Sequence, residues 1–189
     1  MGNYVALLRG INVGGHQPVK MAELQKAFAA LEFQKVKTVL ASGNVLFEAS
    51  KARPPALVGT IENKLEAVFG HPISVLLRTV GEIQDLADAR PFQKINVTPQ
   101  TRLYVTFLSE KPKRELKIPY ESPDNSFTIL RVSDREVCSV LTLSPERQTP
   151  ALMDFLEKAF GRNITTRNWN TITRILECSK TFDERTVGP

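Results

Sequence analysis

The stretch Leu7-Leu8-Arg9-Gly10-Ile11-Asn12-Val13-Gly14-Gly15 decides how the start of the chain folds. It continues an apolar run, Tyr4 to Leu8, that is too short for a helix and contains β-branched and aromatic residues. We therefore expect a strand buried on both faces. The glycines permit positive φ and leave backbone N–H groups uncovered by side chains. Because an amphipathic segment follows, the stretch predicts a strand, a loop and then a helix.

The same loop is a candidate anion site. Successive exposed N–H groups can form an anion-binding nest, and the N-terminus of a following helix adds a favourable field. Arg9 would contribute a planar donor fork suited to phosphate or carboxylate. The alternative is a plain turn in which Arg9 is solvated or paired with a surface acid. Neither the Walker pattern nor GxGxxG matches, so the sequence does not support a P-loop or a Rossmann fold.

The composition is that of an ordinary globular protein. Of its 189 residues, 42% are hydrophobic and 24% charged, which suffices for a core in one or two domains. No apolar run reaches the length of a membrane span, and the first strand begins too early for a signal peptide. Two cysteines, Cys138 and Cys178, predict no disulfide framework, and with only two histidines we expect no metal site. We therefore expect a cytoplasmic protein.

The charge is moderately basic. A net charge of +5 and a pI near 9.3 favour acidic partners such as nucleic acid or phosphorylated small molecules. The densest clusters of basic residues lie at Lys35–Lys37 and Lys111–Lys117. A solvated surface with a slight basic bias is the alternative explanation.

Hydrophobic periodicity predicts the order β-α-β-β-α-β for residues 1–80. After the first strand, the predicted elements are a helix from Met21 to Leu31, strands Val36–Leu40 and Val45–Phe47 joined by a Ser42-Gly43-Asn44 turn, a helix from Pro54 to Gly70, and a strand Ile73–Leu77. This order is the split β-α-β or ferredoxin-like unit, an α/β (α+β) fold. Right-handed crossovers predict the first and fourth strands at the centre of the sheet.

Residues 81–180 predict a second α/β subdomain, and residues 181–189 a loose tail. The predicted elements are a short helix capped by Thr79 and Glu82, a strand Leu103–Leu108, a helical turn within Lys111–Tyr120, a hairpin of Phe127–Val132 and Val137–Leu143, and a helix from Thr149-Pro150 to Gly161. Their order suggests a second, incomplete (degenerate) repeat of the first half, although we find no sequence self-similarity.

The segment from Thr165 to Thr171 opens a helical pattern that runs to about Cys178. Its apolar face contains Trp169, which we assign to the core. Arg167 and Asn170 fall on the opposite face, where they would contact a ligand near the positive end of the helix. The alternative is a solvated helix face with Thr165 or Thr166 as the N-cap.

Three motifs together resemble the bacterial family called domain of unknown function 1697. They are Leu7 to Gly15 followed by Met21 and Leu24, Ser42-Gly43-Asn44-Val45 with Phe47, and Thr166-Arg167-Asn168-Trp169-Asn170-Thr171. The similarity runs from Tyr4 to about Leu176 and departs from the family at Glu32-Phe33, where Gly-Phe is usual. The resemblance implies a ferredoxin-like core, a soluble cytoplasmic protein and no accepted activity.

We hypothesise that the polar residues of these motifs form one pocket for an anionic ligand. The candidate ligand-binding residues are Arg9, Gly10, Asn12, Gly14, Gly15, Ser42, Asn44, Arg167, Asn168 and Asn170. Guanidinium, amide, hydroxyl and backbone N–H groups are the donors that phosphates and nucleotides require.

The best functional interpretation is binding of a phosphate- or carboxylate-bearing small ligand such as a nucleotide. The alternatives are a nucleic-acid-binding or protein-interaction module and a phosphoryl-handling transferase or hydrolase. Ser42 has no histidine in a matching motif to serve as its base, and no paired carboxylates lie in the motifs. The sequence decides neither whether the protein is an enzyme nor which cofactor or oligomeric state it has.

Overall fold

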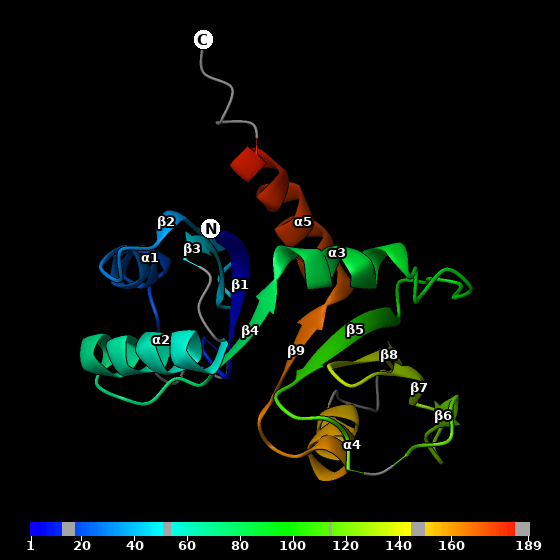
Figure 1. Cartoon of the computed structure of the whole chain (residues 1–189). Coiled ribbons are helices and arrows are strands. Elements are labelled where there is room, and N and C mark those ends of the chain that lie inside the picture. Colours follow the sequence, from blue (N-terminus) through cyan, green and yellow to red (C-terminus); the bar gives the residue numbers. More distant parts are fainter. Residues whose placement is uncertain (13–17, 51–53, 114, 145–149, 184–189) are drawn as a thin grey trace. The chain divides into compact units, whose positions relative to one another are not determined.

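The computed structural model describes residues 1–12, 18–50, 54–113, 115–144 and 150–183. Within these ranges the chain forms two antiparallel sheets and five helices, which confirms the α/β (α+β) class (Figure 1). The chain divides into two compact units. The first contains Met1–Asp85 together with the chain from Thr171 onward, and the second contains Leu86–Asn170. None of the described helices has the length and apolar character needed to cross a bilayer.

The first unit has the ferredoxin-like order of elements. These are β1 (Gly2–Leu8), α1 (Met21–Ala29), β2 (Gln34–Val39), β3 (Asn44–Ala49), α2 (Pro54–Phe69) and β4 (Val75–Thr79). The sheet order is β2-β3-β1-β4, with every neighbouring pair antiparallel. The prediction that the first and fourth strands are central is wrong for β4, which lies at the edge. Each split crossover leaves room for one inserted strand, so β3 lies between β1 and β2, and β1 between β3 and β4.

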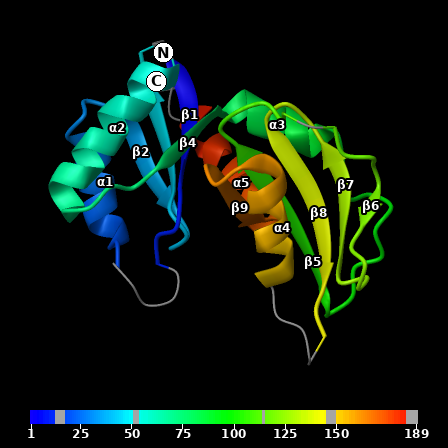
Figure 2. The same ribbon diagram turned by 90° about the horizontal axis from the view of Figure 1, so that it is seen from below.

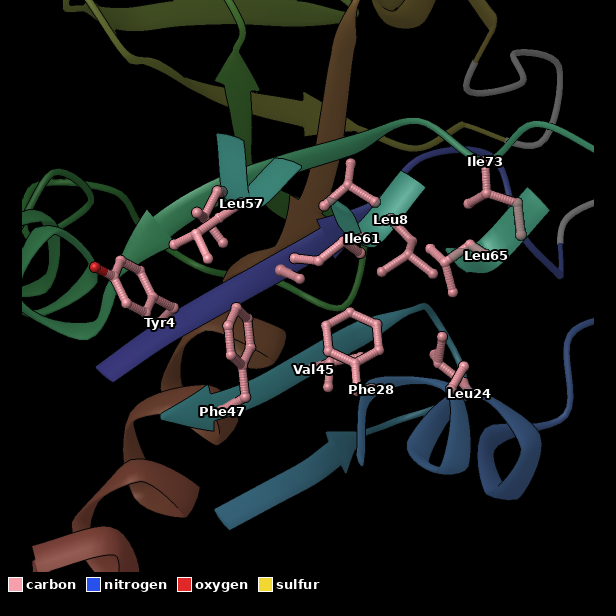
Figure 3. Packing of buried hydrophobic residues seen from close by; sticks show 14 of the residues in the cluster. Tyr4, Leu8, Leu24, Phe28, Val45, Phe47, Leu57, Ile61, Leu65 and Ile73 are labelled. Atoms are coloured by element: carbon pink, nitrogen blue, oxygen red, sulfur yellow. The ribbon is translucent and has the colours of Figure 1, made fainter. Parts of the chain in front are cut away.

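Both helices of this sheet cover the same face (Figure 2). Leu24 and Phe28 from α1 and Ile61 and Leu65 from α2 are fully buried there. Phe47 of β3 lies at the centre of an aromatic group. Its ring centroid is 5.5 Å from that of Phe28 and 5.6 Å from that of Tyr4. Figure 3 shows these side chains pointing toward one another from the sheet and the helices.

The second sheet is built from later strands. The elements that follow β4 are α3 (Val80–Asp88), β5 (Thr101–Leu108), β6 (Tyr120–Glu121), β7 (Phe127–Val132), β8 (Glu136–Thr142), α4 (Pro150–Phe160), β9 (Ile164–Asn168) and α5 (Trp169–Asp183). The predicted capping box is confirmed, because Thr79 Oγ1 accepts the Glu82 N–H and the Glu82 carboxylate accepts the Thr79 N–H. The helical turn expected within 111–120 does not form in its described part. Prolines at both ends of that segment remove backbone donors.

The two sheets have the same strand order. The second sheet runs β6-β7-β8-β5-β9, and β7-β8-β5-β9 corresponds to β2-β3-β1-β4. In both halves of the sequence a helix, α2 or α4, precedes the last strand, and another helix, α3 or α5, follows it directly. Among the described residues, the second half has no counterpart of α1, and it adds the short edge strand β6. The second half thus repeats the topology of the first in degenerate form.

The backbone hydrogen bonds at the end of β1 recur at the end of β5. In the first unit the Leu8 N–H donates to the Gly43 carbonyl at 2.8 Å, and the Arg9 N–H donates to the Ser74 carbonyl at 2.9 Å. The corresponding pairs in the second unit are Leu108 N to Arg135 O at 2.8 Å and Ser109 N to Asn163 O at 3.3 Å. Each central strand is therefore held at the same point by both of its neighbours.

The pairing of β1 with β4 and of β5 with β9 reveals a short sequence similarity between the two halves, which we did not find from the sequence alone. When the two pairings are superposed, Tyr4-Val5-Ala6-Leu7-Leu8 aligns with Tyr104-Val105-Thr106-Phe107-Leu108. Val5 lies opposite Arg78, and Val105 opposite Arg167. The likeness is too short to recognise without knowing which strands correspond.

Gly43 is required by the turn that meets β1. Its φ is +74°, and a Cβ built on it would lie 2.6 Å from Cδ1 of Ile11 and 3.0 Å from Cβ of Leu8. Both the backbone conformation and the close packing therefore exclude a side chain. Gly59, inside α2, has open space around the same position.

We predict that Gly43→Ala lowers the free energy of unfolding by about 2–4 kcal/mol, because it adds backbone strain and a steric clash. Gly59→Ala is the control and should raise it by about 0.5–1 kcal/mol through helix propensity. Urea denaturation followed by circular dichroism measures both. Equal effects of the two substitutions would contradict the role assigned to Gly43.

Candidate functional site

The predicted site residues near the N-terminus begin where β1 ends. Arg9 is half-buried, and its N–H is bonded to the Ser74 carbonyl. Gly10 is exposed with φ +68° and has no atom within 4 Å of its Cβ position. Gly14 and Gly15 lie outside the described residues, so the proposed nest of N–H groups stays a prediction.

The side chain of Asn12 holds this loop in place. Its amide nitrogen donates to the Val19 carbonyl at 3.0 Å and to the Ala41 carbonyl at 2.8 Å, and its oxygen accepts the Val19 N–H at 2.8 Å. Both amide hydrogens are therefore committed to the backbone. Asn12 thus joins Val19 to Ala41 of the β2–β3 turn.

Asn44 has a similar structural role in the β2–β3 turn. It is fully buried, and its amide nitrogen donates to the Val39 carbonyl at 2.8 Å and to the Ser42 hydroxyl at 3.0 Å. Ser42 itself is exposed. Through Asn12 and the Leu8–Gly43 bond, the structure brings Arg9, Gly10 and Asn12 together with Ser42 and Asn44 in the first unit.

Arg167 lies on a strand, which corrects its predicted place on a helix face. It belongs to β9, pairs with Val105 of β5 and is only 7% exposed. Its Nη1 donates to the Thr165 hydroxyl at 2.8 Å and to the Thr166 carbonyl at 2.9 Å. Burial lowers the pKa of its guanidinium to about 10. Threonines, which favour strands, and pairing with β5 override the helical spacing.

The helix that follows is capped by Asn168, not by Thr165 or Thr166 as predicted. Asn168 is the last residue of β9, and its Oδ1 accepts the Asn170 N–H at 2.9 Å. This is the usual contact of an asparagine N-cap with the second helical residue. Asn170 is exposed on the first turn of α5. Asn168 and Asn170 therefore lie together at a helix N-terminus, where the backbone carries partial positive charge.

A hollow of about 180 Å³ opens beside this helix start. Its lining residues all belong to the second unit: Val97, Thr101, Arg102, Leu103, Asn168, Trp169 and Asn170. None of them is acidic. Arg102 is the functional candidate that sequence reasoning missed, because it lies at the start of β5, far along the chain from Asn168. Its Nη1 donates to the carbonyls of Pro99 at 2.8 Å and Thr101 at 2.9 Å.

Trp169 forms one side of the hollow and is half-buried. Its ring meets that of Phe92 edge to face, with centroids 5.1 Å apart and planes at 71°. The prediction that Trp169 belongs to the core is therefore confirmed only in part, because the ring packs on Phe92 but stays half-buried. A ring fixed in this way also gives the hollow a rigid wall.

The predicted site residues divide between the two units. Arg9, Gly10, Asn12, Ser42 and Asn44 belong to the first, and Arg167, Asn168 and Asn170 belong to the second. The hypothesis of one pocket shared by all of these segments therefore stays a prediction.

Other chemistries find little support in the described residues. No group of three His, Cys, Asp or Glu side chains there could hold a metal ion. His71 is half-buried, and its Nδ1 lies 3.5 Å from the Pro72 carbonyl oxygen. His16 lies outside the described residues. Cys138 is fully buried in β8, as predicted for a small hydrophobic residue.

We predict that Arg167→Ala lowers the free energy of unfolding by about 2–4 kcal/mol, because it leaves a cavity and removes the donor to Thr165 and Thr166. Arg167→Met keeps most of the side-chain volume and should lower the free energy of unfolding less. Arg174→Ala, at an exposed position, should leave the urea midpoint unchanged. If Arg167→Ala did the same, the packing role of Arg167 would be excluded.

Cys138 should be chemically inert in the native protein. Burial raises the pKa of its thiol to about 12, opposed by the nearby charge of Arg131 and, to a smaller extent, reinforced by that of Glu136. Since only the thiolate reacts, alkylation by iodoacetamide at pH 8 should be about a thousandfold slower than in urea-unfolded protein. Mass spectrometry of the Cys138 peptide measures this. Equal rates in both states would contradict the assignment.

Comparison with known proteins gives the family and supports the fold. A family model described as "Protein of unknown function (DUF1697)" matches residues 1–137. Among solved structures, conserved bacterial protein SP0830 from Streptococcus pneumoniae superposes with a TM-score of 0.68 at 23% identity, covering 94% of this chain and 98% of that one. This likeness shows the fold alone. No curated protein matches the chain. Since the family model covers well over half of the sequence, the chain belongs to the DUF1697 family of proteins of unknown function.

Proposed function

We propose that this protein binds a small ligand through a phosphate or carboxylate group, at the start of α5. The proposal rests on one observation: a hollow of about 180 Å³ whose lining contains Arg102, Asn168 and Asn170. The hollow contains no acidic side chain to neutralise these groups.

Electrostatics support an anionic ligand. Arg102 is always charged, and it lies beside the positive end of a helix, where a second positive group is unfavourable. A negative group between them would stabilise both. The two carbonyl contacts of Arg102 involve only Nη1, so Nε and Nη2 offer further donors. Asn170 also lines the hollow, from the exposed first turn of α5.

The volume restricts the ligand. At about 180 Å³, the hollow is smaller than the roughly 300–1,000 Å³ of pockets that enclose drug-sized molecules. It fits a phosphate group or a small carboxylic acid. A nucleotide would insert its phosphate and leave the base outside. The net charge of +5 would favour approach of any such anion.

The test is a thermal-shift titration of the full chain with inorganic phosphate, glucose 6-phosphate, AMP and pyruvate at constant ionic strength. At about ten times its Kd, a ligand should raise Tm by about 3–6 °C. We predict that Arg102→Gln and Asn170→Ala abolish most of the shift, because they remove its direct donors. Arg174→Gln, farther along the same helix, is the charge-matched control and should keep the shift.

Four outcomes would count against the proposal or redirect it. If none of the four probes stabilises the protein, or if Arg102→Gln responds like the native chain, the site is wrong. If Arg9→Gln loses the shift as fully as Arg102→Gln, the ligand also needs the N-terminal loop. Binding of a 20-nucleotide RNA that weakens steeply with salt, with no response to the small anions, would favour the nucleic-acid alternative.

A further inference from the structure

The connection between β5 and β6 is where the second unit departs from the first. In the first unit the equivalent connection contains α1, which packs beside α2. In the second unit the described part of residues 109–119 contains no helix. A hollow of about 560 Å³ lies between this connection and the C-terminal half of α4. It shares no lining residue with the hollow at the start of α5.

Part of the lining of this hollow is apolar. Leu116, Phe155 and Phe160 line it, are half-buried and pack against the core cluster of the second sheet. The ring of Phe155 is fixed by stacking on Tyr120, with centroids 4.7 Å apart and planes at 17°. The volume lies within the range of pockets that enclose a small molecule. Such a surface favours a ligand with an apolar body.

Charges of both signs surround this apolar lining. Lys111, Lys113 and Lys158 line the hollow together with Glu110 and Glu115. Lys111 forms an ion pair with Asp134, N to O 3.1 Å. Within the described ranges, neither Lys113 nor Lys158 has an acidic partner. The hollow thus offers two ammonium groups and two carboxylates to a ligand.

The end of α4 adds a further negative contribution. The helix ends at Phe160, and its last carbonyls carry the partial negative charge of a helix C-terminus. The ammonium of Lys158 lies in this last turn, where it is favoured, so a terminal carboxylate can bind Lys158 at this end of the helix. Mixed charge around an apolar floor complements a zwitterion with apolar side chains.

We propose that this hollow binds a short apolar peptide with both ends charged, of two or three residues. Its apolar side chains would lie on Leu116, Phe155 and Phe160. Lys113 and Lys158 would bind the terminal carboxylate, and Glu110 and Glu115 the terminal ammonium. The site takes the place that α1 occupies in the first unit.

The experiment titrates the ¹⁵N-labelled full chain with the dipeptide Leu-Phe and follows amide signals by NMR. Saturable shifts should centre on residues 110–116 and 155–161. N-acetyl-Leu-Phe lacks the ammonium, Leu-Phe-amide lacks the carboxylate, and Gly-Gly lacks the apolar side chains. Each should bind at least about threefold more weakly than Leu-Phe, since exposed charge pairs contribute modestly.

Two variants test the site itself. Lys113→Gln combined with Lys158→Gln should weaken Leu-Phe binding at least about threefold, and Ala159→Leu should weaken it by narrowing the hollow. Lys26→Gln, on α1, removes the same charge elsewhere and should change nothing. The proposal is overturned if Leu-Phe does not saturate, if N-acetyl-Leu-Phe binds equally well, or if the double variant binds like the native chain. Retained binding in Arg102→Gln separates this site from the one at the start of α5.

Discussion

At the ends of β1 and β5, backbone hydrogen bonds join the strand to the turns before both neighbouring strands, and the rest of each unit depends on this arrangement. Leu8 donates to Gly43 and Arg9 to Ser74, and the same pairs recur at Leu108 and Ser109. Because both neighbouring turns are fixed to the strand end, the loop that leaves it starts from one defined point. In the first unit that loop leads to α1, and in the second to residues 109–119.

The polar residues of the three motifs fall into two physical groups. Asn12, Asn44 and Arg167 direct their donors to backbone carbonyls and neighbouring hydroxyls, so they shape loops and strand ends. Asn170, with Arg102 from outside the motifs, lines an open hollow. A polar residue in one of these motifs can therefore either stabilise the backbone by hydrogen bonds or contact a ligand. Burial and hydrogen-bond partners separate the two, since both groups contain the same residue types.

The two hollows lie at different kinds of place. One lies beside the junction of β9 and α5, a strand followed directly by a helix, which both halves of the sequence possess. The other lies beside residues 109–119, whose described part contains no helix like α1 of the first unit. Loss of one helix from a repeated fold exposes the side chains that the helix would otherwise cover. Leu116, Phe155 and Phe160 partly refill that space, and the remaining volume is open.

Local pattern in the sequence determined most of the elements, including the ferredoxin-like order of the first unit, the Thr79–Glu82 capping box and the β7–β8 hairpin. Periodicity and caps depend on residues a few positions apart, so they can be read along the chain. Only the tertiary structure decided that β4 is an edge strand, that Arg167 is buried in β9 and that Arg102 lies beside Asn168. Each of these depends on which strand lies opposite which, and strand register joins residues far apart in the sequence.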